Sequence, residues 1–227
     1  TEIPCFIHIT DGKTHEVNVL DEIEFEANGF YIMDRGFIDY ERLYSIHNQK
    51  AFFVTRAKTN MKCRRIYSAR VDKSTGVRYD QTIKLENVKS LHEYPEKFRR
   101  VKYYDAETDK TFIFLTNNID LSALEIALLY KHRWKIELFF KWIKQHLKVK
   151  SFWGHSENAV RVQIYVAIIT FVTVAYMKHK LEIPLTQYQI LQILSLTLLN
   201  KTPLNQLLSD PNLQNQSSLE CNQLELF

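Results

Sequence analysis

The stretch YKHRWKIELFFKWIKQHLKVK, residues 130–150, decides how the rest of the chain is interpreted. It contains seven Lys and Arg residues and a single acid, Glu137. If the stretch is one α-helix with about 100° between residues, a stripe roughly 80° wide holds Tyr130, Arg133, Glu137, Lys141, Lys144 and Lys148. Apolar residues fill most of the remaining circumference. We therefore expect a helix largely packed inside a domain, with a polar ribbon that suits metal and phosphate chemistry.

A simpler interpretation stands beside this one. Arg133 and Glu137 have opposite charges and are four positions apart, and such pairs stabilise a helix by about 0.2–0.5 kcal/mol without any further role. The helix by itself supports the two interpretations equally.

The charge of the chain is unevenly distributed. The whole chain has a net charge of +4, but residues 51–150 contain 22 Lys and Arg against 11 Asp and Glu, a surplus of 11. Residues 1–50 have a charge of −6 and residues 151–227 a charge of −1. A basic surplus concentrated in one segment indicates a polyanionic partner, most simply nucleic acid.

The cysteines and the termini bear on the cellular location. Cys5, Cys63 and Cys221 are far apart and odd in number, which argues against a disulfide framework or a zinc site. The apolar run Ile164–Met177 is too short for a bilayer, which needs about 20 residues, so we expect a buried core helix there. No signal peptide pattern is present, and we expect a cytoplasmic protein. Because the chain opens on Thr1, directly in a strand-like run, we expect that its true N-terminus is missing.

Hydrophobic patterns predict an α/β chain with three parts. The first part alternates strands and helices, which implies parallel pairing: strands Ile3–Thr10, Phe30–Met33 and Ala51–Thr55, a helix over Val17–Glu26, and a helix through His47 capped by Asp39. The second part is β-rich: Arg64–Ala69, Val77–Lys84, Phe98–Tyr104 and Thr111–Thr116. The third part is helical: Ser122–Lys148, Ser156–Lys180 and Thr186–Leu199. A polar tail after it is predicted to be disordered.

Asp34 follows the short apolar strand Phe30–Met33 and precedes a turn. Open α/β sheets expose their ligand-binding groups at this position. Mg²⁺ accepts one or two protein carboxylates and takes its other ligands from water and substrate phosphate, so Asp34 and a carboxylate from a packed helix could share an ion. The alternative is that Asp34 simply caps the turn.

The pattern Tyr130-x2-Arg133-x3-Glu137-x6-Lys144, together with Asp34-Arg35-Gly36-Phe37 upstream, resembles the signature of bacterial insertion-sequence transposases of the DDE superfamily. The resemblance covers about residues 1–205. It implies a ribonuclease H-like (integrase-like) α/β core, N-terminally truncated, with a β-rich insertion and C-terminal helices. The corresponding boundaries are residues 1–58 for the first part of the core, 59–118 for the insertion, 119–208 for the catalytic helix and C-terminal helices, and 209–227 for the disordered tail.

The same resemblance implies residue roles and partners. Asp34 matches the second catalytic Asp and Glu137 the catalytic Glu, and both would bind metal. DNA-binding roles fall to Tyr130, Arg133, Lys141 and Lys144. The implied cofactor is Mg²⁺, with two ions in the complete protein and Mn²⁺ as a possible substitute. The implied partners are double-stranded DNA, as transposon ends and target, and a second copy in a synaptic homodimer, with no membrane.

Two features depart from the family pattern. Asp11 is only 23 positions before Asp34, so we do not assign it as the first catalytic Asp and expect that residue upstream of Thr1. The insertion has no Trp that could hold a flipped base, so Tyr67, Tyr79 or Tyr103 would have to stack instead. The predicted function is metal-dependent phosphoryl transfer by a DNA transposase, with this fragment alone inactive. The alternative is a non-catalytic DNA-binding remnant of the same fold.

Overall fold

The computed structural model describes residues 3–4, 6–10, 13–147, 149, 151–197, 199, 201 and 203–209. The chain divides into two compact units. One unit spans Thr10–Glu137, and the other combines Thr1–Ile9 with Leu138–Phe227. The division falls inside helix α4 (Trp134–His146), so Glu137 belongs to the first unit and Lys141 to the second.

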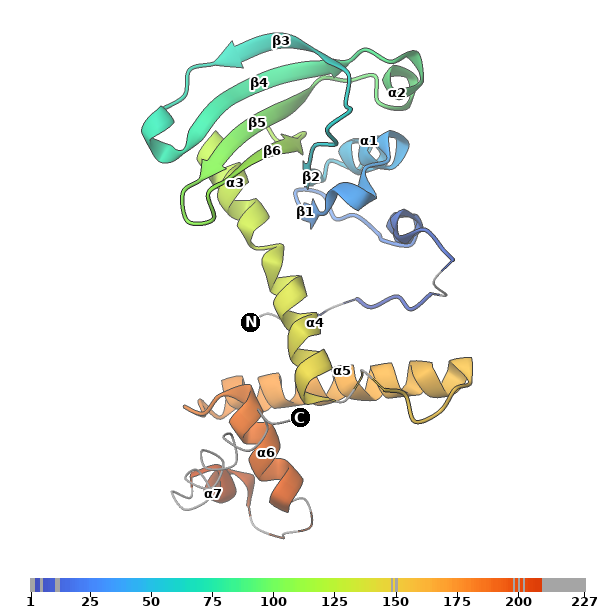
Figure 1. The fold of residues 1–227 in the computed structure, drawn as a ribbon, viewed down its shortest axis with the longest axis vertical. Coiled ribbons are helices and arrows are strands. Elements are labelled where there is room, and N and C mark those ends of the chain that lie inside the picture. The colour runs from blue at the N-terminus through green and yellow to red at the C-terminus, as the bar shows by residue number, and fades with distance from the viewer. Residues whose placement is uncertain are drawn as a thin grey trace. The chain divides into compact units, whose positions relative to one another are not determined.

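A six-stranded sheet forms the centre of unit Thr10–Glu137 (Figure 1). Its strands are β1 (Phe30–Met33), β2 (Phe52–Arg56), β3 (Cys63–Ala69), β4 (Val77–Leu85), β5 (Phe98–Asp105) and β6 (Lys110–Thr116). The spatial order is β1-β2-β6-β5-β4-β3. Only β1 and β2 pair in parallel, and the other pairs are antiparallel. The strands of the predicted insertion, β3 to β6, therefore belong to the same sheet as β1 and β2. The boundaries of the insertion at residues 58 and 118 stay predictions.

Helices cover both faces of this sheet because successive strand residues point to opposite sides. Phe53 belongs to a core cluster with α1 (Tyr40–Asn48), and this cluster also includes Tyr94 at the end of α2 (Val88–Glu93). The next residue, Val54, belongs to a second cluster with α3 (Ala123–Lys131). Three short 3-10 helices lie among the described strands. One precedes β1 (Glu16–Asp21), one follows β1 (Arg35–Phe37) and one lies between β3 and β4 (Lys73–Thr75).

The turn between β3 and β4 requires glycine at its end. Asp72 caps the turn by accepting a hydrogen bond from the Ser74 N–H. Gly76 then has φ +90°, and a Cβ atom there would lie 2.6 Å from the Tyr104 carbonyl oxygen. Both the left-handed backbone and the lack of space exclude any other side chain at this position.

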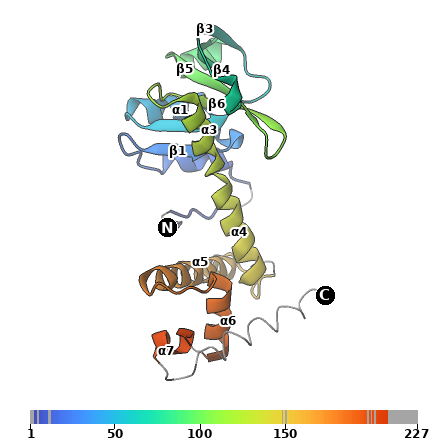
Figure 2. The same ribbon diagram turned by 90° about the vertical axis from the view of Figure 1, so that its left-hand side faces the viewer.

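The second unit is helical in the residues that the structure describes. It contains the end of α4, α5 (Glu157–Lys180), α6 (Gln187–Thr197) and α7 (Leu204–Ser209). Figure 2 shows α6 next to α5, and the two helices share a core cluster that includes Val174 and Ile190. A further cluster joins α4 to α5 through Ile143 and Phe171.

Helix α5 differs from the prediction for Ile164–Met177. It has 24 residues, and only 22% of its most apolar window is buried. By length and composition it could cross a membrane, but one such helix is weak evidence because core helices pass the same test. A largely buried core helix was therefore the wrong prediction. The helix buries one narrow side, including Phe171 and Val174, and exposes apolar residues such as Ile169.

Most predicted elements are confirmed to within about two residues. Strands β1 to β6 match their predicted ranges, and α1, α5 and α6 match theirs. The predicted caps are also present: the Asp39 side chain accepts from the Arg42 N–H, and the Ser156 hydroxyl accepts from the Ala159 N–H. The tail predicted to be disordered lies, apart from Ser209, outside the described residues, as does Asp11.

Three predicted elements were wrong. The described residues of Ile3–Thr10 form no strand, because a β-rich sequence makes a strand only where a partner pairs with it. Within Val17–Glu26 only a short 3-10 helix forms. Ser122–Lys148 is not one helix: α3 ends at Lys131, where the N–H groups of His132 and Arg133 bond three residues back instead of four. The stripe drawn from Tyr130 along a single helix is thereby interrupted, and its Lys148 is outside the described residues.

Candidate active site

Asp34 stands at the carboxyl end of β1, beside the end of the parallel strand β2. Its Oδ1 atom accepts a hydrogen bond from the Arg35 N–H at 2.7 Å, so the predicted turn cap exists. The same atom accepts a second, longer bond of 3.4 Å from the Tyr130 hydroxyl. The Thr55 hydroxyl of β2 donates to the Asp34 carbonyl at 3.2 Å. A turn cap alone does not account for the contact with Tyr130.

Helix α3, which carries Tyr130 in its last turn, is fixed at its other end. The Ser122 hydroxyl accepts from the Glu125 N–H, and the Glu125 carboxylate accepts from the Ser122 N–H. This capping box satisfies two backbone N–H groups that a helix start would leave without partners.

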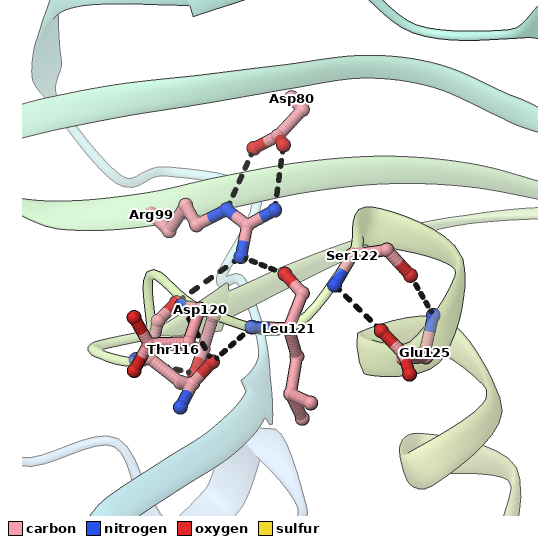
Figure 3. Close-up of polar contacts among 8 residues, drawn as sticks. Asp80, Arg99, Thr116, Asp120, Leu121, Ser122 and Glu125 are labelled. Atoms are coloured by element: carbon pink, nitrogen blue, oxygen red, sulfur yellow. Dashed lines mark hydrogen bonds and ion pairs between the residues drawn. The ribbon is translucent and has the colours of Figure 1, made fainter.

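The loop before α3 is tied to the sheet by Arg99, as Figure 3 shows. Its guanidinium binds both oxygens of Asp80, at 2.9 and 2.6 Å. It also donates to the carbonyls of Asn118 at 3.2 Å and Leu121 at 2.6 Å. Arg99 and Asp80 are each only 8% exposed, so this pair is buried in the sheet. The start of α3 is consequently held by charge-assisted hydrogen bonds from Arg99, which a bidentate pair with Asp80 fixes to the sheet.

Tyr130 is 7% exposed and packs against Phe114 of β6, with 4.8 Å between ring centroids. Burial raises the pKa of its phenol above the ordinary value, an effect that the charge of Asp34 reinforces and the cations Arg133 and Arg56 oppose. The hydroxyl therefore stays protonated at neutral pH and can donate to Asp34.

Arg133 connects Tyr130 to Glu137. Its guanidinium lies 5.5 Å from the centroid of the Tyr130 ring and binds Glu137 Oε1 at 2.7 Å. Burial acts to lower the pKa of Arg133, but the hydrogen bond to Glu137 and the charges of Tyr130, Asp34 and Glu137 raise it overall. The predicted ion pair exists, and it belongs to a contact chain that runs from Asp34 through Tyr130 and Arg133 to Glu137.

The predicted packing around this segment was wrong in part. Ile136, on α4 next to Glu137, is 54% exposed, and Trp134 is also exposed. Only Ile143 is buried on α4, so the helix is not largely packed inside a domain. Lys141 and Lys144 are exposed and belong to the second unit, and their DNA-binding role stays a prediction.

The tyrosines considered for base stacking lie in different environments. Tyr103 is buried against the α3 side of the sheet, so it is not available to a base. The Tyr79 ring is in contact with the cations of Arg100 and Lys102. Tyr67, on the edge strand β3, is 63% exposed. Of the three, Tyr67 has the most exposed ring.

The donor set of the site fits one divalent ion better than two. Asp34 and Glu137 offer the hard carboxylate oxygens that Mg²⁺ prefers, and one or two protein carboxylates suffice for one such ion. A second ion would need a further carboxylate. Within the described part of the chain, no three His, Cys, Asp or Glu side chains are grouped so that they could hold an ion.

Comparison with known proteins identifies the family of this chain. Residues 1–172 match the family described as "Transposase DDE domain". The chain belongs to the DDE transposase family. This family generally uses divalent metal ions and acts on DNA.

Three curated relatives are transposases by name. "Putative transposase y4zB" of Sinorhizobium fredii is 35% identical over 83% of this chain and 54% of its own length. "Probable transposase for insertion sequence element IS5377" of Geobacillus stearothermophilus is 30% identical over 77% and 46%. "Putative transposase for insertion sequence element IS4SA" of Synechocystis is 32% identical over 75% and 48%. The chain spans about half the length of the curated relatives it matches.

Two residues of this DDE transposase chain were missed by sequence reasoning. Arg99 acts through a partner 19 positions away, and no local spacing points to it. Arg56 lies at the end of β2, directly after Thr55, which pairs with the residue before Asp34. A weak sequence signal for Arg56 did exist. Arg56 directly follows the buried residues of β2, and β2 is parallel to β1, the strand that ends just before Asp34.

Proposed function

We propose that this chain is part of a DNA transposase that cuts transposon ends and joins them to target DNA by metal-dependent phosphoryl transfer. The family membership supports the transposase part of the proposal. The observation that carries the catalytic part is the contact chain from Asp34 to Glu137, residues 103 positions apart in the sequence. It links two carboxylates through a phenol and a guanidinium.

Each residue of the contact chain has a role in this proposal. Asp34 and Glu137 would hold one divalent ion, and a second ion would need the further carboxylate of the first catalytic Asp. When bound, such ions supply an activated water or 3′-hydroxyl and stabilise the leaving oxygen. Tyr130 donates to Asp34 and orients its carboxylate. Arg133 orients Glu137 and adds positive charge near the substrate phosphates. Outside the contact chain, Lys141 and Lys144 contact backbone phosphates and position a duplex without reading its sequence.

We also propose that β1, α1 and β2 are part of a ribonuclease H-like core. Their parallel pairing across a connecting helix supports this assignment. In such a core the first catalytic Asp would precede Thr1, and two copies would act together in a synaptic complex.

The test is metal-dependent nicking of a duplex that carries a matched transposon end. We compare residues 1–227 with a longer protein that includes the encoded sequence before Thr1. We expect little cleavage by residues 1–227 with Mg²⁺ or Mn²⁺, and cleavage by the longer protein. Asp34→Ala or Glu137→Ala in the longer protein should abolish cleavage and leave most DNA binding, whereas Glu86→Ala, at an exposed acid after β4, should change neither.

Two outcomes would contradict the proposal. Full cleavage by the Asp34→Ala and Glu137→Ala variants would remove both residues from the catalytic site. DNA binding without metal-dependent cleavage by either form would favour a non-catalytic DNA-binding protein. Robust cleavage by residues 1–227 alone would correct only the position of the first catalytic acid, since another acid of this chain would then complete the site.

A further inference from the structure

Arg56 is the last residue of β2 and lies beside the candidate active site. Strands β1 and β2 are parallel, with Met33 opposite Thr55, so Asp34 and Arg56 follow at the same edge of the sheet. The bond from the Thr55 hydroxyl to the Asp34 carbonyl, 3.2 Å, holds the two strand ends together. In Figure 1, β1 and β2 lie side by side.

The Arg56 side chain points to the sheet face that carries Tyr130. In the antiparallel pair with β6, Arg56 lies opposite Phe114, and the Phe114 ring is 4.8 Å from the Tyr130 ring. The Arg56 guanidinium lies over Phe112, 5.1 Å from its ring centroid. Residues at diagonal positions on neighbouring strands share a face, so Arg56, Phe112 and Tyr130 are on the same side.

Arg56 differs from two nearby cations, Arg133 and Lys131, in having no anionic partner among the described residues. Arg133 binds Glu137, and Lys131 binds Asp105 and Glu107. Among the ion pairs and hydrogen bonds of the described residues, none involves the Arg56 side chain. A half-buried guanidinium that stacks on an aromatic ring keeps its N–H groups free at its edges, in the fork geometry that suits phosphate.

We propose that Arg56 binds a phosphate group of the DNA strand that lies at Asp34. This assignment rests on the proposed function, because it takes DNA as the substrate. A purely structural arginine in this protein is bonded differently: Arg99 uses its donors on Asp80 and on two backbone carbonyls. Arg56 is stacked and oriented by Phe112, and its donors are left for a ligand.

The test measures duplex DNA affinity of the full chain by fluorescence anisotropy over a range of salt concentrations. Each phosphate contact contributes about −0.9 to the slope of log affinity against log salt. We expect Arg56→Gln to make the slope less negative by about 0.9. Arg56→Lys should keep the slope, because the charge remains, and should bind several-fold more weakly, because the bidentate fork is lost. Lys89→Gln, at an exposed lysine on α2, is the matched control and should change neither quantity.

A second measurement covers the case in which Arg56→Gln does not fold. Phenylglyoxal modification of the wild-type chain, mapped by mass spectrometry, should be slower at Arg56 when duplex DNA is present. Arg161, exposed on α5 and paired with Glu157, serves as the reference.

The outcomes separate this inference from the proposed function. The inference alone would be overturned if the wild-type chain binds duplex DNA and the salt slope of Arg56→Gln equals that of the wild type. Equal modification of Arg56 with and without DNA would overturn it too. A wild-type chain, and a longer protein, without salt-dependent binding to duplex DNA would overturn the proposed function instead.

Discussion

Replacing Arg99 by Met tests how the start of α3 is held. The substitution removes the guanidinium and keeps most of the side-chain volume. The Asp80 carboxylate then stays buried without a partner, and the carbonyls of Asn118 and Leu121 lose a donor. Removing one partner of a buried ion pair costs about 3–5 kcal/mol, because the remaining charge has left water without compensation. We expect a loss of this size in the stability of the sheet that contains β5.

Native-state hydrogen exchange of the β5 amides in the full chain measures this loss locally. Every 1.4 kcal/mol is a factor of ten, so exchange should accelerate by roughly 10²- to 10⁴-fold. Lys89→Ala is the control. It breaks a pair of 3.7 Å in which the lysine is 84% exposed, and such surface pairs contribute little.

A double variant, Asp80→Leu with Arg99→Met, refines the test. It removes both charges, and replacing a buried pair by apolar residues of similar size is often close to neutral. Exchange should therefore return most of the way to the wild-type rate. A single Arg99→Met variant that exchanges less than tenfold faster than wild type would refute the reasoning, since Asp80 would then be compensated by water.

Three further predictions concern the site and the two units. Tyr130→Phe removes the donor to Asp34; we expect slower metal-dependent cleavage by the longer protein, with duplex affinity preserved, and an equal rate would leave Tyr130 with a packing role only. Tyr94→Phe removes the 2.6 Å bond between the Tyr94 hydroxyl and His47 Nδ1 and should destabilise the sheet unit by about 1 kcal/mol in urea unfolding, while Tyr67→Phe at the exposed edge should have no measurable effect. His146 packs on Trp142 and Tyr188, and burial lowers its pKa, so the unfolded chain binds more protons than the folded one. Neutral His146 therefore stabilises the fold above its unfolded pKa of about 6.5, and this contribution is lost as the pH falls. Thermal unfolding at pH 7.5 and 5.5 should show a smaller acid effect in His146→Phe than in wild type.

Local sequence signals were sufficient for most of the secondary structure. Alternating and β-branched residues predicted β3 to β6, and the turn residues Lys73–Gly76 separated β3 from β4. The failure at Ile3–Thr10 has a different origin, because pairing of a strand depends on a distant partner. The break at His132 also escaped prediction, since the residues on both sides of it favour a helix.

The candidate site was only partly predictable for the same reason. The spacing of Arg133 and Glu137 is local, and their ion pair was expected from it. The contact between Asp34 and Tyr130 joins residues 96 positions apart and was not predicted from the sequence. Arg56 and Arg99 depend on cross-strand register, which a single sequence does not reveal.

Helix α3 sets the distance between two positions that are held by hydrogen bonds. Its first turn is held next to Arg99, and Tyr130 in its last turn contacts Asp34. Tyr130 is eight positions after Ser122, a length of about 12 Å along the helix. One inserted residue would add about 1.5 Å and turn Tyr130 by about 100°, away from Asp34. Natural variation in chain length should therefore be found in turns such as 106–109 and be absent between Ser122 and Tyr130.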